Sequence, residues 1–481
     1  MSGITERLYQ GSPIWAQQCA VAAYGWWWYR RRFSTHFHRL VAELKARERW
    51  TIEQFRNYQE GQLNKVLEVA WNSPYHRQVF AEAGVSSTVK ASDSLRRLPL
   101  LSKETLRTSA RDLLTQCPLP KGTISFKSSG TTGTPTEIFY TPEFHALEVA
   151  VLEARNLNWA GVDYRDRRVM FGVRKVCRFD QRKPPFWRFS PAENLAYASI
   201  YHLSPEFLPF YLNFLRSYRP AIIMGYPSAL NTIACYAFSN NDMPFPAKAV
   251  VTTSETVTAD TRKRIETTFQ CRIYDTYGAV EGCLFASQCE YGRYHVSPEI
   301  GLLEIVDRMG HAVPPGVMGE VICTGLHNLL QPLIRYRVGD VARWAVDQDC
   351  RCNRQMPVLE NIEGRFEDIC YTPDGREMLR FDTVFKGIEN IREAQVVQEK
   401  IDVFTVHVVP TNGFDERDIE TIKHNMRLHV GNVHTEVKSV DAIARTASGK
   451  FRAVICKLSH EEKTLIAQTE PDDARHLQVQ L

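Results

Sequence analysis

A loop rich in glycine, serine and threonine has the composition that binding of a polyphosphate requires. It spans residues 128–136, between extended-looking segments at residues 123–126 and 137–141. Glycine relieves the steric limits on φ, so such a loop can direct several backbone N–H groups and hydroxyls toward one anion. It lacks the Gly-Lys-Ser/Thr ending of a Walker loop. We therefore predict a phosphate site, with an ordinary polar hairpin turn as the alternative. The predicted contacts are Ser128, Ser129, Gly130, Thr131, Thr132, Gly133 and Thr134.

A second group, residues 275–281, combines an aromatic ring, a glycine and a carboxylate after a strand-like segment. Tyr277 can stack on a nucleotide base, and Gly278 lets the backbone approach that base. Glu281, three residues beyond the glycine, can hold a Mg²⁺ ion that bridges phosphate oxygens. The alternatives are a core position for Tyr277 and a solvated surface position for Glu281.

Alternating strand-like and helix-like segments must position these residues. We expect strands at residues 168–173, 221–225, 249–252 and 272–274, and helices at residues 206–218, 226–238 and 259–269. Such alternation implies a parallel sheet covered by helices, in which ligands gather at the carboxyl ends of the strands. The candidate site residues at those ends are Tyr226, Pro227, Ser228, Thr253, Ser254, Glu255, Asp275, Thr276, Tyr277, Gly278, Ala279, Val280 and Glu281.

The rest of the chain supplies a helical front, a β-rich stretch and a small tail. Helical spacing of apolar residues covers 35–72 and 98–113, residues 300–346 are β-rich, and the tail has strands at 394–399, 403–409 and 435–440 with a helix at 416–430. We expect an α/β fold: a large N-terminal domain of helix-covered, mainly parallel sheets plus a β-rich subdomain, and a small α+β C-terminal domain. The expected boundaries are residues 1–120 for the helical layer of the large domain, 121–366 for its core and 367–481 for the C-terminal domain.

Composition narrows the class of protein. The chain has 481 residues, of which 44% are apolar and 24% charged, as expected of a globular protein with a large core. A net charge of +4 is small for this length and argues against a nucleic-acid partner. Twelve cysteines are scattered through a chain without a secretory signal. We therefore expect a cytoplasmic protein whose cysteines are mostly reduced, in cores or in a metal site.

One N-terminal segment, residues 13–32, is rich in aromatic residues and ends in Arg30-Arg31-Arg32. It is too short and too interrupted by glutamines to span a bilayer, and its basic cluster follows the apolar run, unlike that of a signal peptide. Aromatic residues beside arginines are typical of an interfacial helix, which predicts peripheral membrane contact. The alternative is that the segment packs on its own protein.

Three later elements follow in order: Tyr336…Gly339-Asp340, Glu363-Gly364-Arg365…Asp368 and Ser448-Gly449-Lys450. Together with the 128–136 loop and residues 277–281, they resemble the motifs of the adenylate-forming (acyl-AMP) ligase superfamily. The resemblance covers residues 124–455. Within the superfamily the chain looks like the phenylacetate–CoA ligase branch, and there like the CapK-type proteins associated with capsular polysaccharide synthesis. That finer resemblance is carried by the opening Gln17…Gly25…Arg30-Arg31-Arg32 and by residues 371–376, 392–398 and 448–452.

The resemblance implies a role for each matched residue. The loop would hold the β- and γ-phosphates of ATP, and Asp340 would accept hydrogen bonds from both ribose hydroxyls. Lys450 would contact the substrate carboxylate and the α-phosphate, where negative charge gathers. Arg365 would meet the ribose or the α-phosphate. Glu367 and Asp368 would form the hinge of a mobile lid, residues 367–481, that carries Lys450. Ser254, Glu255, Asp275 and Thr276 would complete the nucleotide site.

The implied function is an ATP-dependent carboxylate ligase that uses Mg²⁺. A small-molecule carboxylic acid would form an acyl-adenylate with release of pyrophosphate, and a thiol (CoA or a carrier protein) or an amine would then take the acyl group. Two departures bear on this: the phosphate loop ends Pro135-Thr136-Glu137 where many relatives have Pro-Lys, and residues 371–376 replace a glycine-containing stretch common in CoA ligases. The alternative is a non-catalytic, nucleotide-binding scaffold in polysaccharide biosynthesis.

Four residues have spacing that fits a metal site. Cys289 and His295 form Cys-x5-His, and Cys350 and Cys352 form Cys-x-Cys. Relatives in this branch carry a similar set, which resembles a tetrahedral Cys₃His structural zinc site. The alternative is four unrelated side chains, since cysteine is common in cores. Cys283 is a further, weaker candidate ligand.

The acyl group of the substrate needs a pocket of its own. We expect it among Tyr226, Pro227, Val280 and residues 171–178. Arg174, Lys175 and Arg178 in that stretch could steer an anionic substrate, with solvated surface as the alternative.

Overall fold

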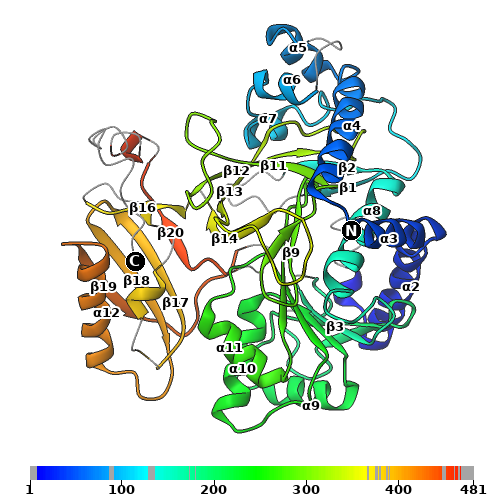
Figure 1. Ribbon diagram of the computed structural model, residues 1–481. Helices are drawn as coiled ribbons and strands as arrows, with labels where there is room; N and C mark the ends of the chain where they lie inside the picture. The colour runs from blue at the N-terminus through cyan, green and yellow to red at the C-terminus, as the bar shows by residue number, and fades with distance from the viewer. Residues whose placement is uncertain are drawn as a thin grey trace. The chain divides into compact units, whose positions relative to one another are not determined.

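The chain folds into two compact units, Met1–Ile362 and Glu363–Leu481 (Figure 1). The computed structural model describes residues 8–85, 91–127, 136–172, 174–178, 180–365, 368–373, 377–378, 381–385, 388, 390–446, 451–459, 461–463 and 466. The predicted fold class is confirmed: a large unit of mixed α/β structure precedes a small α+β unit.

A twelve-stranded sheet forms the centre of the first unit, with strand order β11-β12-β13-β14-β10-β9-β8-β7-β6-β3-β5-β4. Its strands are β3 (Arg168–Gly172), β4 (Trp187–Ser190), β5 (Leu195–Ser199), β6 (Ile222–Gly225), β7 (Ala249–Thr253), β8 (Ile273–Gly278), β9 (Phe285–Gln288), β10 (Tyr294–Val296), β11 (Gly301–Val306), β12 (Gly319–Gly325), β13 (Tyr336–Trp344) and β14 (Val358–Arg365).

The sheet has two halves of different strand direction. Strands β5, β3, β6, β7 and β8 are parallel, and we call them the parallel half. Strands β9–β14 form the antiparallel half, with antiparallel ladders between β9 and β10, β10 and β14, β11 and β12, and β12 and β13. The predicted β-rich region thus continues the same sheet through the antiparallel β8–β9 ladder.

Helices cover the parallel half because β5, β6 and β7 are each followed by a helix with an apolar face. Helix α9 (Leu208–Tyr218) packs Tyr211 and Leu215 into the same core as Val169 of β3 and Ile223 of β6. Helices α10 (Pro227–Ser239) and α11 (Ala259–Phe269) lie side by side (Figure 1). The hydroxyl of Thr258 accepts a hydrogen bond from a first-turn N–H of α11 and so fixes where that helix begins.

Seven helices precede β3 among the described residues: α2 (Ile14–Arg32), α3 (Thr35–Arg47), α4 (Ile52–Ala70), α5 (Pro74–Glu82), α6 (Ala91–Arg97), α7 (Lys103–Thr108) and α8 (Pro142–Leu152). Helix α8 continues into a π-helical turn, Glu153–Leu157, and follows the β1 (Ile124–Lys127) and β2 (Glu137–Tyr140) hairpin.

Several predicted boundaries are wrong in this front region. The single helix expected at 35–72 is two helices, because Thr51 starts a new one with a capping box. Directly after this stretch, Ser73 caps a further helix, α5, and Pro74 begins it. Only Lys103–Thr108 of the helix expected at 98–113 is helical.

The second unit contains a four-stranded sheet of order β19-β18-β17-β20. It comprises β17 (Ile391–Lys400), β18 (Val403–Pro410), β19 (His434–Ser439) and β20 (Val454–Cys456), with the short β15 (Cys370–Tyr371) and β16 (Glu377–Met378) pair besides. Helix α12 (Glu416–His429) buries Ile422 and Met426 in the same core as Val406. Strands β17, β18 and β19 and helix α12 lie where the sequence predicts them, whereas β15, β16 and β20 were not predicted.

Candidate active site

A cavity of about 420 Å³ opens at the carboxyl ends of the parallel strands. This is the edge at which a parallel sheet is expected to bind ligands. The lining is largely apolar and comes from α8, β3, β5–β8 and the segments that follow them. The lining residues are Glu148, Leu152, Met170, Phe171, Gly172, Arg174, Tyr197, Ala198, Met224, Gly225, Tyr226, Val251, Thr253, Ser254, Thr276, Gly278, Ala279, Leu284 and Phe285.

Close backbone approach shapes this cavity. A Cβ at Gly225 would lie 2.9 Å from the carbonyl oxygen of Phe171, so only glycine lets β6 end this close to β3. Ser254, just after β7, holds a left-handed φ of 72°. Non-glycine residues rarely adopt this conformation, and it is found more often at ligand sites.

Six of the predicted strand-end residues line the cavity: Tyr226, Thr253, Ser254, Thr276, Gly278 and Ala279. Burial, with Glu255 and Tyr201 nearby, raises the pKa of Tyr226 to about 12, so its hydroxyl stays protonated. Pro227, Val280 and Glu255 are not among the lining residues. Glu255 instead accepts hydrogen bonds from the backbone N–H (3.0 Å) and the hydroxyl (3.1 Å) of Ser228, and so joins the end of β7 to the start of α10.

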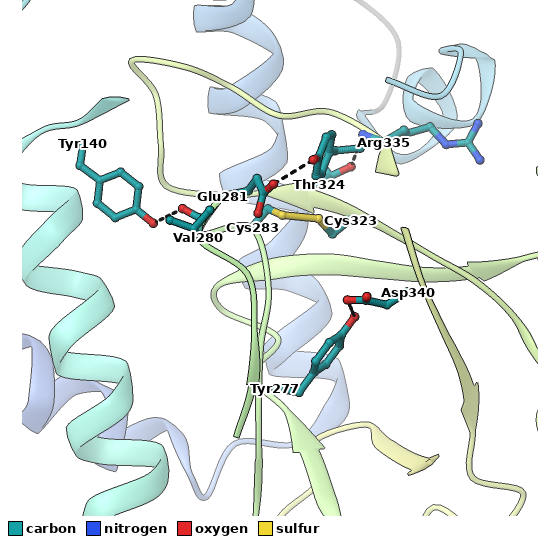
Figure 2. Close-up of a disulfide and its surroundings, with 10 residues drawn as sticks. Tyr140, Tyr277, Val280, Glu281, Cys283, Cys323, Thr324, Arg335 and Asp340 are labelled. Atoms are coloured by element: carbon teal, nitrogen blue, oxygen red, sulfur yellow. Dashed lines mark hydrogen bonds between the residues drawn. A yellow bond between two sulfur atoms is a disulfide. The ribbon is translucent and has the colours of Figure 1, made fainter. Parts of the chain in front are cut away.

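The motif residues of β8 and β13 meet beside this edge. The Tyr277 hydroxyl donates to Asp340 Oδ2 at 2.9 Å, and Figure 2 shows the two side chains directed at one another. The Tyr336 hydroxyl donates to Glu281 Oε1 at 2.9 Å. Tyr277, Glu281 and Asp340 are all buried. Two hydrogen bonds therefore join residues 277–281 to β13, which lies far from them in the sequence.

A disulfide joins Cys283, two residues beyond Glu281, to Cys323 of β12 (Figure 2). Its Cα atoms lie 6.0 Å apart, and both residues are buried. The bond ties the segment after Glu281 to the antiparallel half. The prediction of Cys283 as a further metal ligand is wrong, because both sulfur atoms are committed to this bond. The other ten cysteines form no disulfide among the described residues.

Asp275 is committed to neighbouring hydroxyls. Its carboxylate accepts hydrogen bonds from Thr252 Oγ1 and from the Tyr294 hydroxyl, each at 2.5 Å. Burial raises the pKa of Asp275 to about 6 although these bonds, and Arg262, favour the charged form. Asp275 does not line the cavity; it links β7, β8 and β10.

The four predicted metal ligands come together. One ligand atom from each of Cys289, His295, Cys350 and Cys352 lies within 4.8 Å of all the others. The Sγ atoms of Cys289 and Cys350 are 3.7 Å apart, and Cys352 Sγ is 3.3 Å from His295 Nε2. Three thiols and one imidazole at this spacing fit a tetrahedral zinc ion.

The rest of the predicted site residues belong to other parts of the chain. Residues 128–134, Glu367 and Lys450 lie outside the described residues. Arg365 ends β14. In the second unit, the Asp368 carboxylate pairs with the guanidinium of Arg452.

The N-terminal helix α2 packs on its own protein along one face. Gln17, Gly25 and Trp28 are buried. A Cβ at Gly25 would lie 1.8 Å from Ser190 Oγ, so glycine is required there. The opposite face is open, with Trp15 72% and Trp26 54% exposed. No helix among the described residues is long and apolar enough to cross a membrane.

Sequence reasoning missed α8, β4 and β5, and with them Glu148 and Tyr197 of the cavity. The signal for α8 was present: Thr141 caps it and Pro142 stands at its first position. Its core-forming run, PEFHALEVAVL, is apolar on most sides and so lacks the periodicity of a surface helix.

Comparisons with known proteins agree with this geometry. A family model for AMP-binding enzymes matches residues 194–330, and a model for the CapK C-terminal domain matches residues 370–457. The protein CapK of Staphylococcus aureus is 25% identical over 461 residues, which are 93% of this chain and 98% of that protein. A phenylacetate–coenzyme A ligase of Thermus thermophilus is 26% identical over 327 residues, or 66% of this chain and 72% of that one.

A crystal structure of 2-hydroxyisobutyryl-CoA ligase in the postadenylation state, in complex with R3-HIB-AMP, has the same fold. It superposes with a TM-score of 0.68 at 20% identity and covers 88% of this chain and 94% of that chain. Together the family models, the relatives and the fold define an AMP-forming ligase of the adenylate-forming superfamily. Within that superfamily the chain is similar to the phenylacetate–CoA ligases and to CapK.

Proposed function

We propose that this protein activates a carboxylic acid with ATP and transfers the resulting acyl group to an acceptor. A carboxylate oxygen of the acid attacks the α-phosphorus of ATP, and pyrophosphate leaves with the bonding electron pair. The acceptor then attacks the acyl carbonyl, loses its proton, and AMP leaves. The observation that carries this proposal is the pair of hydrogen bonds, Tyr277 to Asp340 and Tyr336 to Glu281, that join the end of β8 and the segment after it to β13, where β8 also lines an apolar cavity.

The nucleotide would lie along β8 and β13. Asp340 would accept from the ribose hydroxyls, and Tyr277, which donates to Asp340, would keep that carboxylate in place. Glu281 would hold Mg²⁺, whose charge assists departure of pyrophosphate. One oxygen of Glu281 accepts from Tyr336, and the other has no hydrogen-bond donor among the described residues, as a metal ligand requires.

The remaining roles come from matching motifs. Residues 128–134 would hold the β- and γ-phosphates. Arg365 and Lys450 would meet the α-phosphate side, with Lys450 brought by the second unit as it turns about Glu367 and Asp368. A single well-aimed donor of this kind is worth on the order of 10²–10³ in rate.

The acid would occupy the cavity, and a thiol is the acceptor that the relatives favour. Phenylacetate–coenzyme A ligases are among those relatives, so we propose CoA or a carrier-protein thiol, with an amine as the competing acceptor. The similarity to CapK along nearly the whole chain supports a place in capsular polysaccharide biosynthesis. It also leaves one rival, a catalytically inactive scaffold that keeps the nucleotide site.

The Cys/His cluster would bind a structural zinc ion. Cys289 follows β9, His295 lies in β10, and Cys350 and Cys352 precede β14, so the ion would join three segments of the antiparallel half. Cys289 and His295 are buried, and Trp159 packs with its ring centroid 6.0 Å from that of His295. A closed, covered site without a free position fits a structural role, not a catalytic one.

Helix α2 offers a membrane-facing surface. Its exposed Trp26 and Trp27 carry Arg30 and Arg31 over their rings, at 5.1 and 5.9 Å from the ring centroids. Tryptophan and arginine together suit the interface of an anionic bilayer. Flotation with anionic vesicles tests this: Trp26→Ala with Trp27→Ala should reduce binding, whereas no flotation of the intact chain excludes the contact.

Hydroxylamine trapping tests the proposed function. The protein, ATP and Mg²⁺ are incubated with aryl, fatty, hydroxylated and amino acids, and hydroxamates report acyl-adenylates. At least one acid should give a hydroxamate that requires ATP. Nucleotide binding without a hydroxamate from any acid would favour the scaffold.

A further inference from the structure

The cavity at the strand ends contains a carboxyl group that has no partner among the described residues. Glu148 of α8 is the only carboxylate among the lining residues, and most of its neighbours there are apolar. Glu148 makes no hydrogen bond or ion pair with any described residue, and its side chain is half-buried in the cavity wall. A carboxyl group in apolar surroundings is stabilised by a hydrogen bond, which a bound ligand can supply.

Burial also keeps this carboxyl group neutral. Desolvation raises the pKa of Glu148 to about 8, because the apolar surroundings disfavour the charged form. A neutral carboxyl group has one O–H donor and acceptor oxygens. It therefore matches a ligand group that can both donate and accept.

Arg174, the only cation among the lining residues, does not satisfy Glu148. Its guanidinium lies over the Tyr197 ring, 4.4 Å from the centroid. Tyr197 in turn donates to Glu193 Oε2 at 2.8 Å, and Glu193 pairs with Arg32 of α2 at 2.9 Å. The guanidinium is thus held on an aromatic face, and Arg174 forms no ion pair within the described part of the chain.

We propose that the acid activated by this enzyme carries a hydroxyl group on an apolar skeleton, in addition to the carboxylate that reacts, and that Glu148 selects that hydroxyl. This inference rests on the proposed function. The cavity volume of about 420 Å³ suits a small organic acid. The apolar lining takes the skeleton, and Glu148 gives the hydroxyl both a donor and an acceptor.

Charge in the cavity disfavours the other polar groups. An ammonium group would share the cavity with the Arg174 guanidinium and be repelled by it. A second carboxylate would stand near Glu148, and the two would resist ionising together. A hydroxyl meets neither obstacle.

The consequence is strong discrimination between an acid that carries the hydroxyl group and the analogue that lacks it. A site that is built to hydrogen-bond a hydroxyl rejects the analogue that lacks it, because the protein group is then left buried and unpaired. An apolar pocket without such a group distinguishes the two acids far less.

Pairs of acids with one skeleton, each with and without a hydroxyl, test this in the full-length protein. Pyrophosphate release gives kcat and KM for each acid in the wild type, in Glu148→Gln and in Glu148→Leu. The wild type should prefer the hydroxylated member by on the order of 100-fold or more. Glu148→Leu should abolish or reverse the preference through KM, and Glu148→Gln, whose amide still donates and accepts, should retain most of it. Glu143→Leu, an exposed position on the same helix, serves as the matched control and should leave the ratio unchanged.

A second measurement separates this inference from the proposed function. Calorimetry follows binding of the same acid pairs in the absence of turnover. Tighter binding of hydroxylated acids that is lost in Glu148→Leu supports the inference even if no pyrophosphate is released, in which case only the proposed function fails. Equal binding of both members, or a preference for amino acids or dicarboxylic acids, overturns it. So does a hydroxyl preference that Glu148→Leu leaves intact.

Discussion

Polar side chains at two places in the central sheet differ in whether they have partners within the protein. In the antiparallel half and its junction with β8, reactive and charged groups meet partners: Cys283 bonds Cys323, and Tyr277 donates to Asp340. The parallel half ends in a cavity where Glu148 has no partner among the described residues and Ser254 holds a left-handed φ.

We interpret the paired groups as a fixed frame that holds the nucleotide, and the group without a partner as part of the pocket for the acid. Groups that must hold a nucleotide in fixed geometry benefit from supporting bonds, because small displacements reduce the rate of an oriented reaction. Groups that select one acid among many can stay without a protein partner, because the bound acid supplies their hydrogen bond. We therefore take Glu148, which has no partner among the described residues, to indicate the substrate, and the paired side chains of β8 and β13 to indicate the catalytic frame.

The largest expected effect comes from breaking the Cys/His cluster. The purified protein should hold about one zinc ion per chain, and Cys350→Ser with Cys352→Ser should lose it and unfold at a much lower temperature, since structural zinc sites in small domains contribute about 10 kcal/mol or more. Elemental analysis and thermal denaturation measure this. Cys19→Ser, at an exposed free cysteine, is the control. A folded, active wild type without bound metal would contradict the zinc site.

Removing the disulfide should have the next largest effect. Cys283 and Cys323 are 40 residues apart, and cross-linking a loop of that length is worth about 4 kcal/mol in the chain-entropy model. Cys323→Ala should therefore lower the free energy of unfolding in urea by an amount of this order. Alkylation of the unreduced, denatured wild type should leave two of its twelve cysteines unlabelled. Labelling of all twelve would show that the bond does not form in solution.

Loosening the nucleotide frame should have a smaller effect. Tyr277→Phe removes one hydrogen bond to the Asp340 carboxylate, which costs about 1.5–3 kcal/mol. We expect KM for ATP to rise while KM for the acid changes little. Tyr291→Phe, at an exposed tyrosine, is the control. Equal changes in both KM values would place Asp340 outside the nucleotide site.

The smallest effect is a pH dependence that originates on α8. His145 lies between Trp28 and Phe126, and burial, with Arg31 and Arg32 nearby, lowers its pKa from 6.5 to about 3. The unfolded chain therefore binds a proton below pH 6.5 that the folded chain does not, and stability is lost as pH falls. At pH 5.5 this loss is about 1 kcal/mol. Denaturation from pH 5 to 7 should show a flatter acid limb in His145→Phe, and an unchanged limb would exclude this origin.

The sequence predicts elements well where each has a regular pattern and its own boundary signal. The helix expected at 259–269 forms at Ala259–Phe269, because Thr258 caps it and its apolar residues recur at helical spacing. Helix α8 was missed because apolar residues lie on most of its faces, so they show no helical period. Strands β4 and β5 were missed because Arg188, which is buried, interrupts the apolar pattern. In both cases burial by the rest of the fold allows a sequence that the local pattern does not predict.

The candidate site was predictable where residues stand close together in a motif. Cys-x5-His and Cys-x-Cys each place two ligands near one another, and the fold then unites the two pairs. The Cys283–Cys323 pairing was not predictable, since either residue has many possible partners among twelve cysteines. Glu148 was not either, because only the cavity distinguishes it from an ordinary helical glutamate.

Acid-dependent exchange of labelled pyrophosphate into ATP tests the central claim most directly. We predict exchange by the full-length protein that requires a carboxylic acid and that Lys450→Ala reduces by on the order of 100-fold or more, while ATP binding is retained. ATP binding without exchange in the presence of any acid, or exchange that Lys450→Ala leaves unchanged, would contradict it.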